Sequence, residues 1–161
     1  MTVGIESPVF LLIDALEAAQ TQARAAGLAY AGGVSPQLAW DLTQAGEAVL
    51  VDVRSGEERK FVGHVPGSVH VAWATGTNLT RNPRFVRELE AKLADCGGKD
   101  ATALLLCRSG KRSVLAAEAA TKAGFTHVLN VLEGFEGEID NHQQRGHGDG
   151  WRFRGLPWVQ D

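Results

Sequence analysis

An apolar run followed by a glycine-containing loop and an alanine-rich stretch is the feature that most constrains this chain. Residues 103–106 are apolar, residues 107–113 carry no periodic pattern, and residues 114–123 are rich in alanine. This order predicts a strand, a tight loop and a helix, which is a unit of an α/β fold with a largely parallel sheet. The loop begins with Cys107, so we expect this cysteine at the carboxyl end of a buried strand, facing the amino end of a helix.

Basic residues and a glycine follow Cys107 in the loop. Arg108, Lys111 and Arg112 could hold an anionic substrate or adduct, and Gly110 permits a sharp backbone turn. Cations and a helix N-terminus lower the pKa of a thiol from its usual value of about 8.5. A lone cysteine at a strand end is more often a small buried hydrophobic residue. The surrounding cations lead us to predict a reactive thiolate instead.

Other apolar runs predict further strands and helices around this unit. Residues 48–53 and 125–132 read as strands, and 69–72 as a shorter one. Helical spacing predicts helices over 8–26, with Ser7 as its cap, and over 36–44, and a third helix that begins at Pro83. We expect a loop over 75–83.

Charged residues end the strand at 48–53, at the sheet edge where Cys107 is also expected. Asp52 and Arg54 are predicted to pair and fix the loops, a role more common there than catalysis. Ser55 and Glu58 have the spacing of a helix capping box. Ligands of parallel sheets bind beyond the carboxyl ends of the strands, so both segments indicate one site.

Composition limits the kinds of binding partner and the cellular compartment that we expect for this protein. With 161 residues, the chain suits one domain, and its net charge of −3 offers no general surface for nucleic acid. No apolar run approaches membrane-spanning length. The two cysteines give no disulfide framework and the first residues lack the basic region of a secretory signal, so we expect a cytoplasmic protein. His64 and His70 lack further convergent ligands, and we expect neither a metal nor a cofactor.

Three segments of the sequence resemble the single-domain rhodaneses, thiosulfate sulfurtransferase-like members of the rhodanese superfamily. The matching blocks are 51–68, the loop 107–113, and 124–135 with 151–158. The resemblance spans about 34–161, which leaves 1–33 as an N-terminal helical extension and linker. It implies a three-layer α/β fold with a mostly parallel sheet of about five strands flanked by helices. The insertion between Phe135 and Trp151 is longer than usual for the family.

The resemblance also implies a reaction and a set of site residues. The Cys107 thiolate would take the outer sulfur from an anionic donor, thiosulfate being favoured by the basic loop, and pass it from a persulfide to cyanide or a protein thiol. Cys107 would be catalytic, the substrate would bind to Arg108, Ser109, Gly110, Lys111, Arg112 and Ser113, and structural support would come from Asp52, Arg54 and Glu58.

Two alternatives stay open, as does the oligomeric state. One is a rhodanese module that relays sulfur without turnover or only binds a protein partner. The presence of Cys107 argues against pure scaffolding. The other is a phosphatase or arsenate reductase. Four residues separate Cys107 from Arg112, one fewer than in the related phosphatases, and the shorter ring fits a sulfur atom better than a phosphate.

Overall fold

A parallel sheet forms the centre of the computed structural model, which describes residues 8–161. Its strands are β1 (Gly33–Val34), β2 (Val49–Asp52), β3 (Val69–His70), β6 (Thr102–Leu106) and β7 (His127–Val131). Within the described residues these five strands lie in the order β1-β7-β6-β2-β3, all parallel. The predicted α/β fold with a parallel sheet of about five strands is confirmed.

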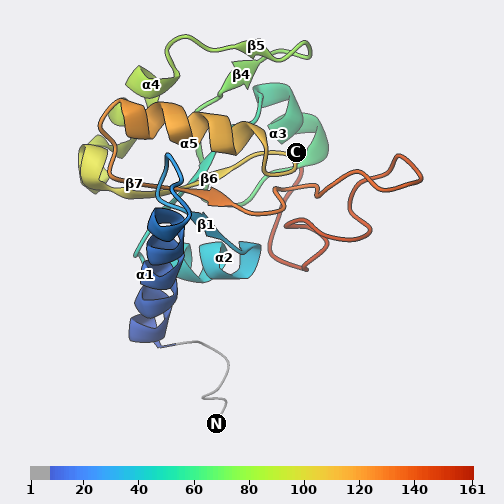
Figure 1. Cartoon of the computed structure of the whole chain (residues 1–161). Coiled ribbons are helices and arrows are strands. Elements are labelled where there is room, and N and C mark those ends of the chain that lie inside the picture. The colour runs from blue at the N-terminus through green and yellow to red at the C-terminus, as the bar shows by residue number, and fades with distance from the viewer. Residues whose placement is uncertain (1–7) are drawn as a thin grey trace.

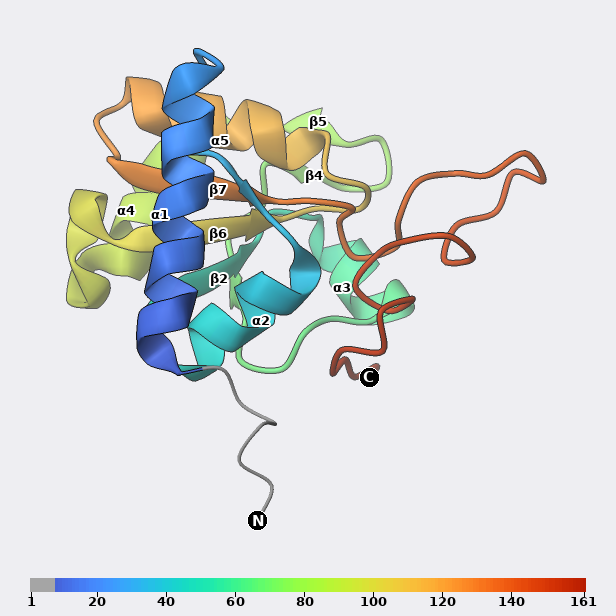
Figure 2. The same ribbon diagram turned by 60° about the horizontal axis from the view of Figure 1, so that its bottom comes forward.

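Helices cover both faces of the sheet and give three layers (Figure 1). On one face lie α1 (Val9–Ala25) and α2 (Pro36–Gln44), and on the other α4 (Phe85–Leu93) and α5 (Arg112–Lys122). The turned view shows α1 crossing the lower face beside α2 (Figure 2). The short helix α3 (Gly56–Val62) follows β2, and two 3-10 turns, η1 (Ala94–Cys96) and η2 (Gly98–Asp100), lead into β6.

Strand β6 is apolar throughout because both of its faces are buried. Leu105 belongs to the core that α4 and α5 cover, whereas Leu104 and Leu106 belong to the core under α1 and α2. Successive side chains of a strand point to opposite faces, so a central strand between two helix layers needs an apolar residue at every position. Strand β6, the middle strand of the sheet, therefore holds Cys107 at the start of the loop in a rigid position.

Capping residues begin the helices as the sequence indicates. Ser35 Oγ accepts a hydrogen bond from Leu38 N (3.1 Å), one turn into α2. At α3 the predicted capping box is present: Glu58 N donates to Ser55 Oγ (3.2 Å) and Ser55 N donates to Glu58 Oε1 (3.1 Å). The predicted cap of α1, Ser7, lies outside the described residues.

Two short elements differ from the predicted pattern. Residues 27–33 were expected to be a linker, yet their end forms the edge strand β1, which pairs with β7. The expected loop over 75–83 contains most of an antiparallel hairpin of β4 (Ala74–Thr75) and β5 (Thr80–Arg81). Strands of two residues are too short to show an alternating pattern, so only their hydrogen-bond partners reveal them.

The segment after β7 runs through turns and packs its aromatic tail back on the core. Trp151 is fully buried and meets Trp40 of α2 edge to face, with ring centroids 6.0 Å apart. His64 and Val159 exchange backbone hydrogen bonds of 2.9 Å, which joins the end of the chain to the turn after α3. Among residues 8–161 no helix has both the length and the apolar character needed to cross a membrane.

Candidate active site

Cys107 lies directly after β6, in the loop that leads into α5. The residue is 1% exposed, and Gly110 N donates a hydrogen bond to its Sγ (3.1 Å). The loop can turn back on the sulfur because Gly110 has φ of +93°, a region that favours glycine. The first turn of α5, which begins at Arg112, presents amide N–H groups that have no partner within the helix. The sulfur is thus buried near polar donors.

A closed ring of polar contacts surrounds this sulfur. Ser113 Oγ lies 3.1 Å from Cys107 Sγ and donates a hydrogen bond to Asn130 Oδ1 on β7. Asn130 Nδ2 in turn donates to the carbonyl of Gly110 (3.3 Å), whose N–H reaches the sulfur. Ser113 and Asn130 are both buried. The side chain of Asn130 therefore positions both groups that contact the sulfur.

The direction of each hydrogen bond in the ring follows from one carbonyl. The Gly110 oxygen can only accept, so the amide nitrogen of Asn130 faces it and the amide oxygen faces Ser113. The single hydroxyl proton of Ser113 then goes to Asn130, and Ser113 offers lone pairs to Cys107. In this arrangement a Cys107 thiol donates its proton to Ser113 Oγ.

The cations of the loop do not all face the sulfur. Arg112 forms two hydrogen bonds to Glu58, of 2.8 and 2.7 Å, and both side chains are largely buried. The exposed Lys111 pairs with Glu138 (3.1 Å). Within residues 8–161 Arg108 has no ion pair, and its buried Nε has no hydrogen-bond partner. We expected all three cations to face an anionic ligand, but Glu58 and Glu138 already pair with Arg112 and Lys111. The substrate-binding roles of the three cations stay a prediction.

The pKa values of Arg112 and Glu58 reflect their pairing. Burial alone would raise the pKa of Glu58, but the hydrogen bonds and charge of Arg112, helped by Ser55 N and Arg54, hold it below its ordinary value. Burial would likewise lower the pKa of Arg112, but Glu58, Cys107 and Asp52 raise it. The pair is therefore ionised around neutral pH and neutralises much of the charge of Arg112.

A second ion pair fixes the segment after β2. Arg54, fully buried, donates to Asp52 Oδ1 through Nε (3.1 Å) and to Asp52 Oδ2 through Nη2 (2.8 Å). Its Nη2 also donates to the carbonyl of Gly63 (2.7 Å), and its guanidinium lies 4.2 Å from the ring centroid of Phe135. The predicted pairing of Asp52 with Arg54 is present. His70 Nε2 contacts the Arg54 carbonyl (2.7 Å), a structural contact.

The turn after β7 is joined to the Cys107 loop by backbone hydrogen bonds. Phe135 N donates to the Cys107 carbonyl (2.8 Å), and Glu136 N donates to the Arg108 carbonyl (2.9 Å). Gly134 has φ of +70°, and a Cβ there would lie 2.5 Å from the Arg108 backbone. Only a glycine allows this approach, so the turn and the loop form one rigid unit.

Cavities lie at both ends of the sheet. One of about 410 Å³ adjoins the loop, and Arg108 and Arg145 are among its lining residues. The glycine-rich stretch 146–150 contributes no described lining residue to this cavity.

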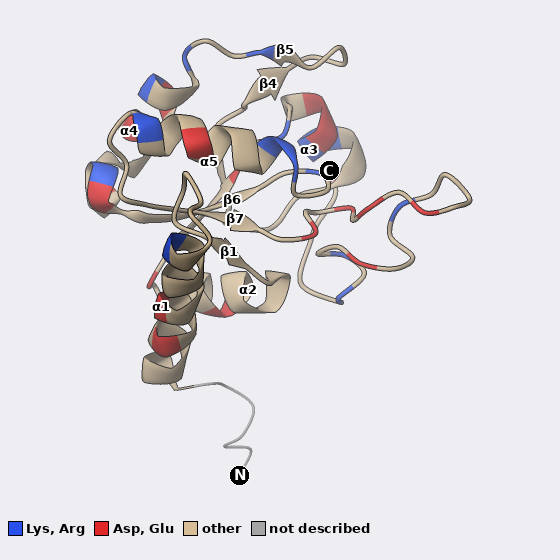
Figure 3. Ribbon diagram, in the orientation of Figure 1, with Lys and Arg blue, Asp and Glu red and all other residues tan. Residues whose placement is uncertain are grey.

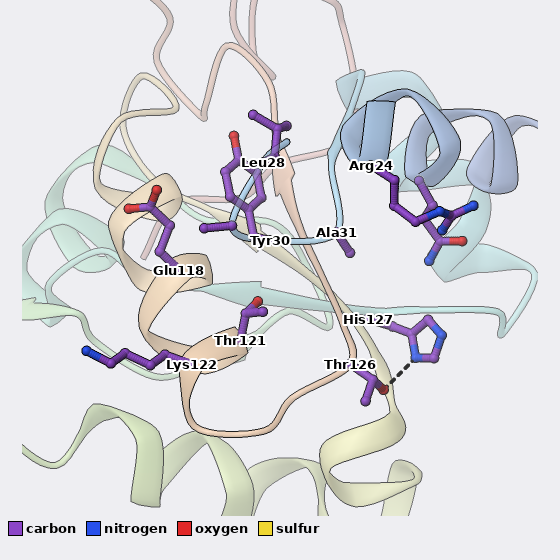
Figure 4. Close-up of a pocket in the computed structure, with 11 residues that line it drawn as sticks. Arg24, Leu28, Tyr30, Ala31, Glu118, Thr121, Lys122, Thr126 and His127 are labelled. Carbon is purple, nitrogen blue, oxygen red and sulfur yellow. Dashed lines mark hydrogen bonds between the residues drawn. The ribbon is translucent and has the colours of Figure 1, made fainter. Parts of the chain in front are cut away.

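A larger cavity, of about 650 Å³, lies between α1 and the end of α5 (Figure 4). Its lining includes Tyr30, whose pKa is raised by burial and by the charge of Glu118. His127, at the start of β7, also lines it, so it lies at the amino ends of the strands, away from Cys107. Because parallel sheets bind ligands at the carboxyl ends, we place the site at the loop.

A comparison with protein families matches the model of the rhodanese-like domain to residues 35–138. The chain belongs to the rhodanese-like domain family. A relative from Rickettsia prowazekii, the uncharacterized protein RP600, is 35% identical over 69% of this chain and 82% of its own length. The chloroplastic thiosulfate sulfurtransferase 16 of Arabidopsis thaliana is 31% identical over 67% of this chain and 87% of its own length. The relatives of this rhodanese-like domain thus include a sulfurtransferase.

Solved structures agree with this membership. The crystal structure of Rv0390 from M. tuberculosis is 45% identical and matches 82% of this rhodanese-like chain and 99% of its own, with a TM-score of 0.69. The polysulfide-sulfur transferase of Wolinella succinogenes shares the fold, with a TM-score of 0.53 at 23% identity over 96% of this chain and 95% of its own.

Sequence reasoning missed two residues that shape the rhodanese-like loop. We interpreted Asn130 as part of an apolar strand and Gly134 as one of several glycines in a turn. A polar residue inside a strand that is buried on both faces was the available signal for Asn130, because such a residue needs a buried partner. Nothing local marked Gly134, since its close approach to Arg108 exists only in the folded chain.

Proposed function

We propose that this protein is a sulfurtransferase that carries a sulfane sulfur on Cys107, with thiosulfate as the donor. The observation that carries the proposal is the Cys107 sulfur, held between Gly110 N and Ser113 Oγ at the amino end of α5. Family membership and a thiosulfate sulfurtransferase among the relatives support it.

The reaction takes place in two displacements. The Cys107 thiolate attacks the outer sulfur of thiosulfate, the sulfur–sulfur bond breaks, and sulfite leaves with the bonding electron pair. An acceptor such as cyanide then attacks the outer sulfur of the persulfide, and the Cys107 thiolate is regenerated. The proton of the resting thiol passes to solvent before the first attack. Unpartnered amides of the loop and α5, with Arg108, stabilise the anions.

Mass spectrometry of the intact protein after thiosulfate treatment tests this proposal. We expect the wild-type chain to gain the mass of one sulfur atom and to lose it on addition of cyanide. Cys107→Ser should gain nothing. Cys96→Ser is the matched control and should behave like wild type, because Cys96 is exposed and lies at the end of η1.

Other outcomes point to the alternatives. Sulfur uptake that a protein thiol discharges but cyanide does not would indicate a relay module rather than a turnover enzyme. Hydrolysis of a phosphate ester without sulfur uptake would indicate a phosphatase. Uptake that survives Cys107→Ser would reject the persulfide on this residue.

A further inference from the structure

The cavity of about 410 Å³ beside the Cys107 loop is much larger than thiosulfate, the proposed donor, or cyanide, a possible acceptor, requires. A water molecule occupies about 30 Å³ in the liquid, so cyanide or thiosulfate would fill only a small part of it. Three separate segments build the cavity: α3, the turn between β4 and β5, and the chain after β7. It borders the loop through Arg108, the residue that directly follows Cys107.

Three carboxylates and two guanidinium groups of the described residues lie on the cavity wall. Arg108 and Arg145 line the cavity, and among the described residues neither forms an ion pair with a carboxylate. The buried Nε of Arg108 has no hydrogen-bond partner. Arg145, half-buried, donates through Nη1 to the carbonyl of Gly137 (2.9 Å).

Most of the carboxylates in the wall are already engaged. Glu58 is held by Arg112, and Glu136 lies 4.0 Å from Arg152. Glu57 is exposed and sits in the first turn of α3, where the helix dipole favours a negative charge. Figure 3 shows acidic and basic residues interspersed along the segment after β7. This segment contains Arg145, which lines the cavity. Two guanidinium groups thus remain for a ligand.

Apolar side chains form another part of the wall. Phe61 of α3 is 69% exposed although it borders the cavity. Leu79 also lines it, with φ of +53°, a left-handed conformation that L-residues rarely adopt. Backbone strain of this kind concentrates at ligand sites. The cavity therefore offers both apolar surface and guanidinium groups to a ligand.

We propose that this cavity binds the sulfur acceptor, and that the acceptor is a small organic thiol carrying a carboxylate. The inference rests on the proposed function. Guanidinium groups bind carboxylates through paired hydrogen bonds, so Arg108 and Arg145 hold the carboxylate while the carbon chain lies against Phe61 and Leu79. The acceptor thiolate attacks the outer sulfur of the Cys107 persulfide. The bond between the two sulfurs of the persulfide breaks, Cys107 leaves as a thiolate, and the acceptor becomes a persulfide. Arg145 is a specificity-determining residue for this step.

A two-stage experiment separates this inference from the proposed function. The full-length protein is first loaded with thiosulfate, and loading is verified by mass; failure at this stage rejects the proposed function. The loaded protein, freed of thiosulfate, is then discharged by 3-mercaptopropionate, 2-mercaptoethanol or cysteamine, which are anionic, neutral and cationic. Each rate is divided by the thiolate fraction of the thiol at the working pH.

We expect 3-mercaptopropionate to discharge the wild-type persulfide faster than 2-mercaptoethanol, and cysteamine to be the slowest. Arg145→Gln should lower the ratio of the first two rates by about threefold to tenfold, the range for losing one hydrogen bond of ordinary strength. Arg87→Gln is the matched control: it removes the same charge from an exposed position on α4 and should leave the ratio unchanged. Raising the ionic strength should reduce the wild-type ratio.

Two outcomes would overturn the inference. Equal corrected rates for the three thiols in the wild-type protein would show that the cavity does not select charge. A preference for 3-mercaptopropionate that survives Arg145→Gln, or that falls equally in Arg87→Gln, would place the selection elsewhere than in this cavity.

Discussion

At the scale of single residues, Asn130 determines where the proton of Ser113 points. Its amide oxygen accepts the hydroxyl proton of Ser113, and its amide nitrogen holds the Gly110 carbonyl. A hydroxyl that donated to the sulfur instead would stabilise the thiolate. Asn130 therefore keeps the Ser113 proton away from the Cys107 sulfur, and it also keeps the Gly110 amide in place.

Replacing Asn130 with leucine should make Cys107 more reactive. The Ser113 proton would turn toward the sulfur, and we expect alkylation by iodoacetamide at pH 6 to be about threefold to tenfold faster. The variant should lose about 1–3 kcal/mol of stability, because Ser113 and the Gly110 carbonyl lose buried partners. Peptide mass analysis measures the alkylation, with exposed Cys96 as the internal control.

The double variant Asn130→Leu with Ser113→Ala distinguishes proton placement from loosening of the loop. If the proton is responsible, the added Ser113→Ala removes the gain in reactivity. A gain that persists in the double variant would mean that the loop has simply become more accessible.

Glu58 links the pH dependence of stability to the active loop. Its pKa is below the ordinary value in the folded protein, so it stabilises the fold above the unfolded pKa of about 4.3 and loses this contribution as the pH falls. Glu58→Gln should destabilise the protein by about 1–3 kcal/mol at pH 7. Urea unfolding at several pH values should show the difference shrinking below about pH 4. A difference independent of pH would contradict the ionised pair with Arg112.

At the scale of elements, the loop after β6 and the turn after β7 act as one unit. The sheet places the ends of these neighbouring parallel strands side by side. Backbone hydrogen bonds from residues 135–137 to the carbonyls of Cys107 and Arg108 then join the two segments. The precision of the site comes from this backbone pairing as well as from side chains.

Gly134→Ala should disturb the loop without touching a polar side chain. The new Cβ would lie 2.5 Å from the Arg108 backbone, at φ of +70°. We expect a loss of at least about 1–2 kcal/mol in stability and about tenfold or more in the rate of sulfur uptake. Gly148→Ala is the control, because nothing lies within 4 Å of its added Cβ. Denaturant unfolding and initial rates of uptake measure both effects; equal rates in the two variants would contradict the coupling.

At the scale of the whole molecule, α1 is part of the packed structure. Leu12, Leu16 and Ala23 of α1 are buried, and the first two join the core that α2 and the sheet share. The chain after α1 returns through β1 to the edge of the sheet beside β7. The division into an extension over 1–33 and a domain over 34–161 stays a prediction, but α1 packs as a layer of the fold.

Leu16→Ala should measure how much α1 stabilises the fold. Leu16 is 8% exposed, and truncating a leucine in such a position costs about 2–4 kcal/mol. Leu11→Ala, at a position that is 49% exposed, should change stability by less than about 0.5 kcal/mol. Urea unfolding compares them. Equal small effects would mean that α1 does not pack on the sheet in solution.

The sequence alone determined the features that depend on near neighbours along the chain. Apolar runs predicted the central strands, Ser55 and Glu58 predicted the capping box of α3, and the composition of the loop singled out Cys107. These features could be predicted because helix caps and buried strands are set by residues only a few positions apart.

Only the tertiary structure decided which groups act on the sulfur. Arg112 is neutralised by Glu58, which lies 54 positions away, and Asn130 reaches Ser113 from another strand. Ion pairs and buried hydrogen bonds depend on distances of a few ångströms in space, which the order of residues does not give. The sequence therefore singled out Cys107 as the proposed nucleophile, whereas the fold left Arg108 as the loop cation without an ion pair among residues 8–161.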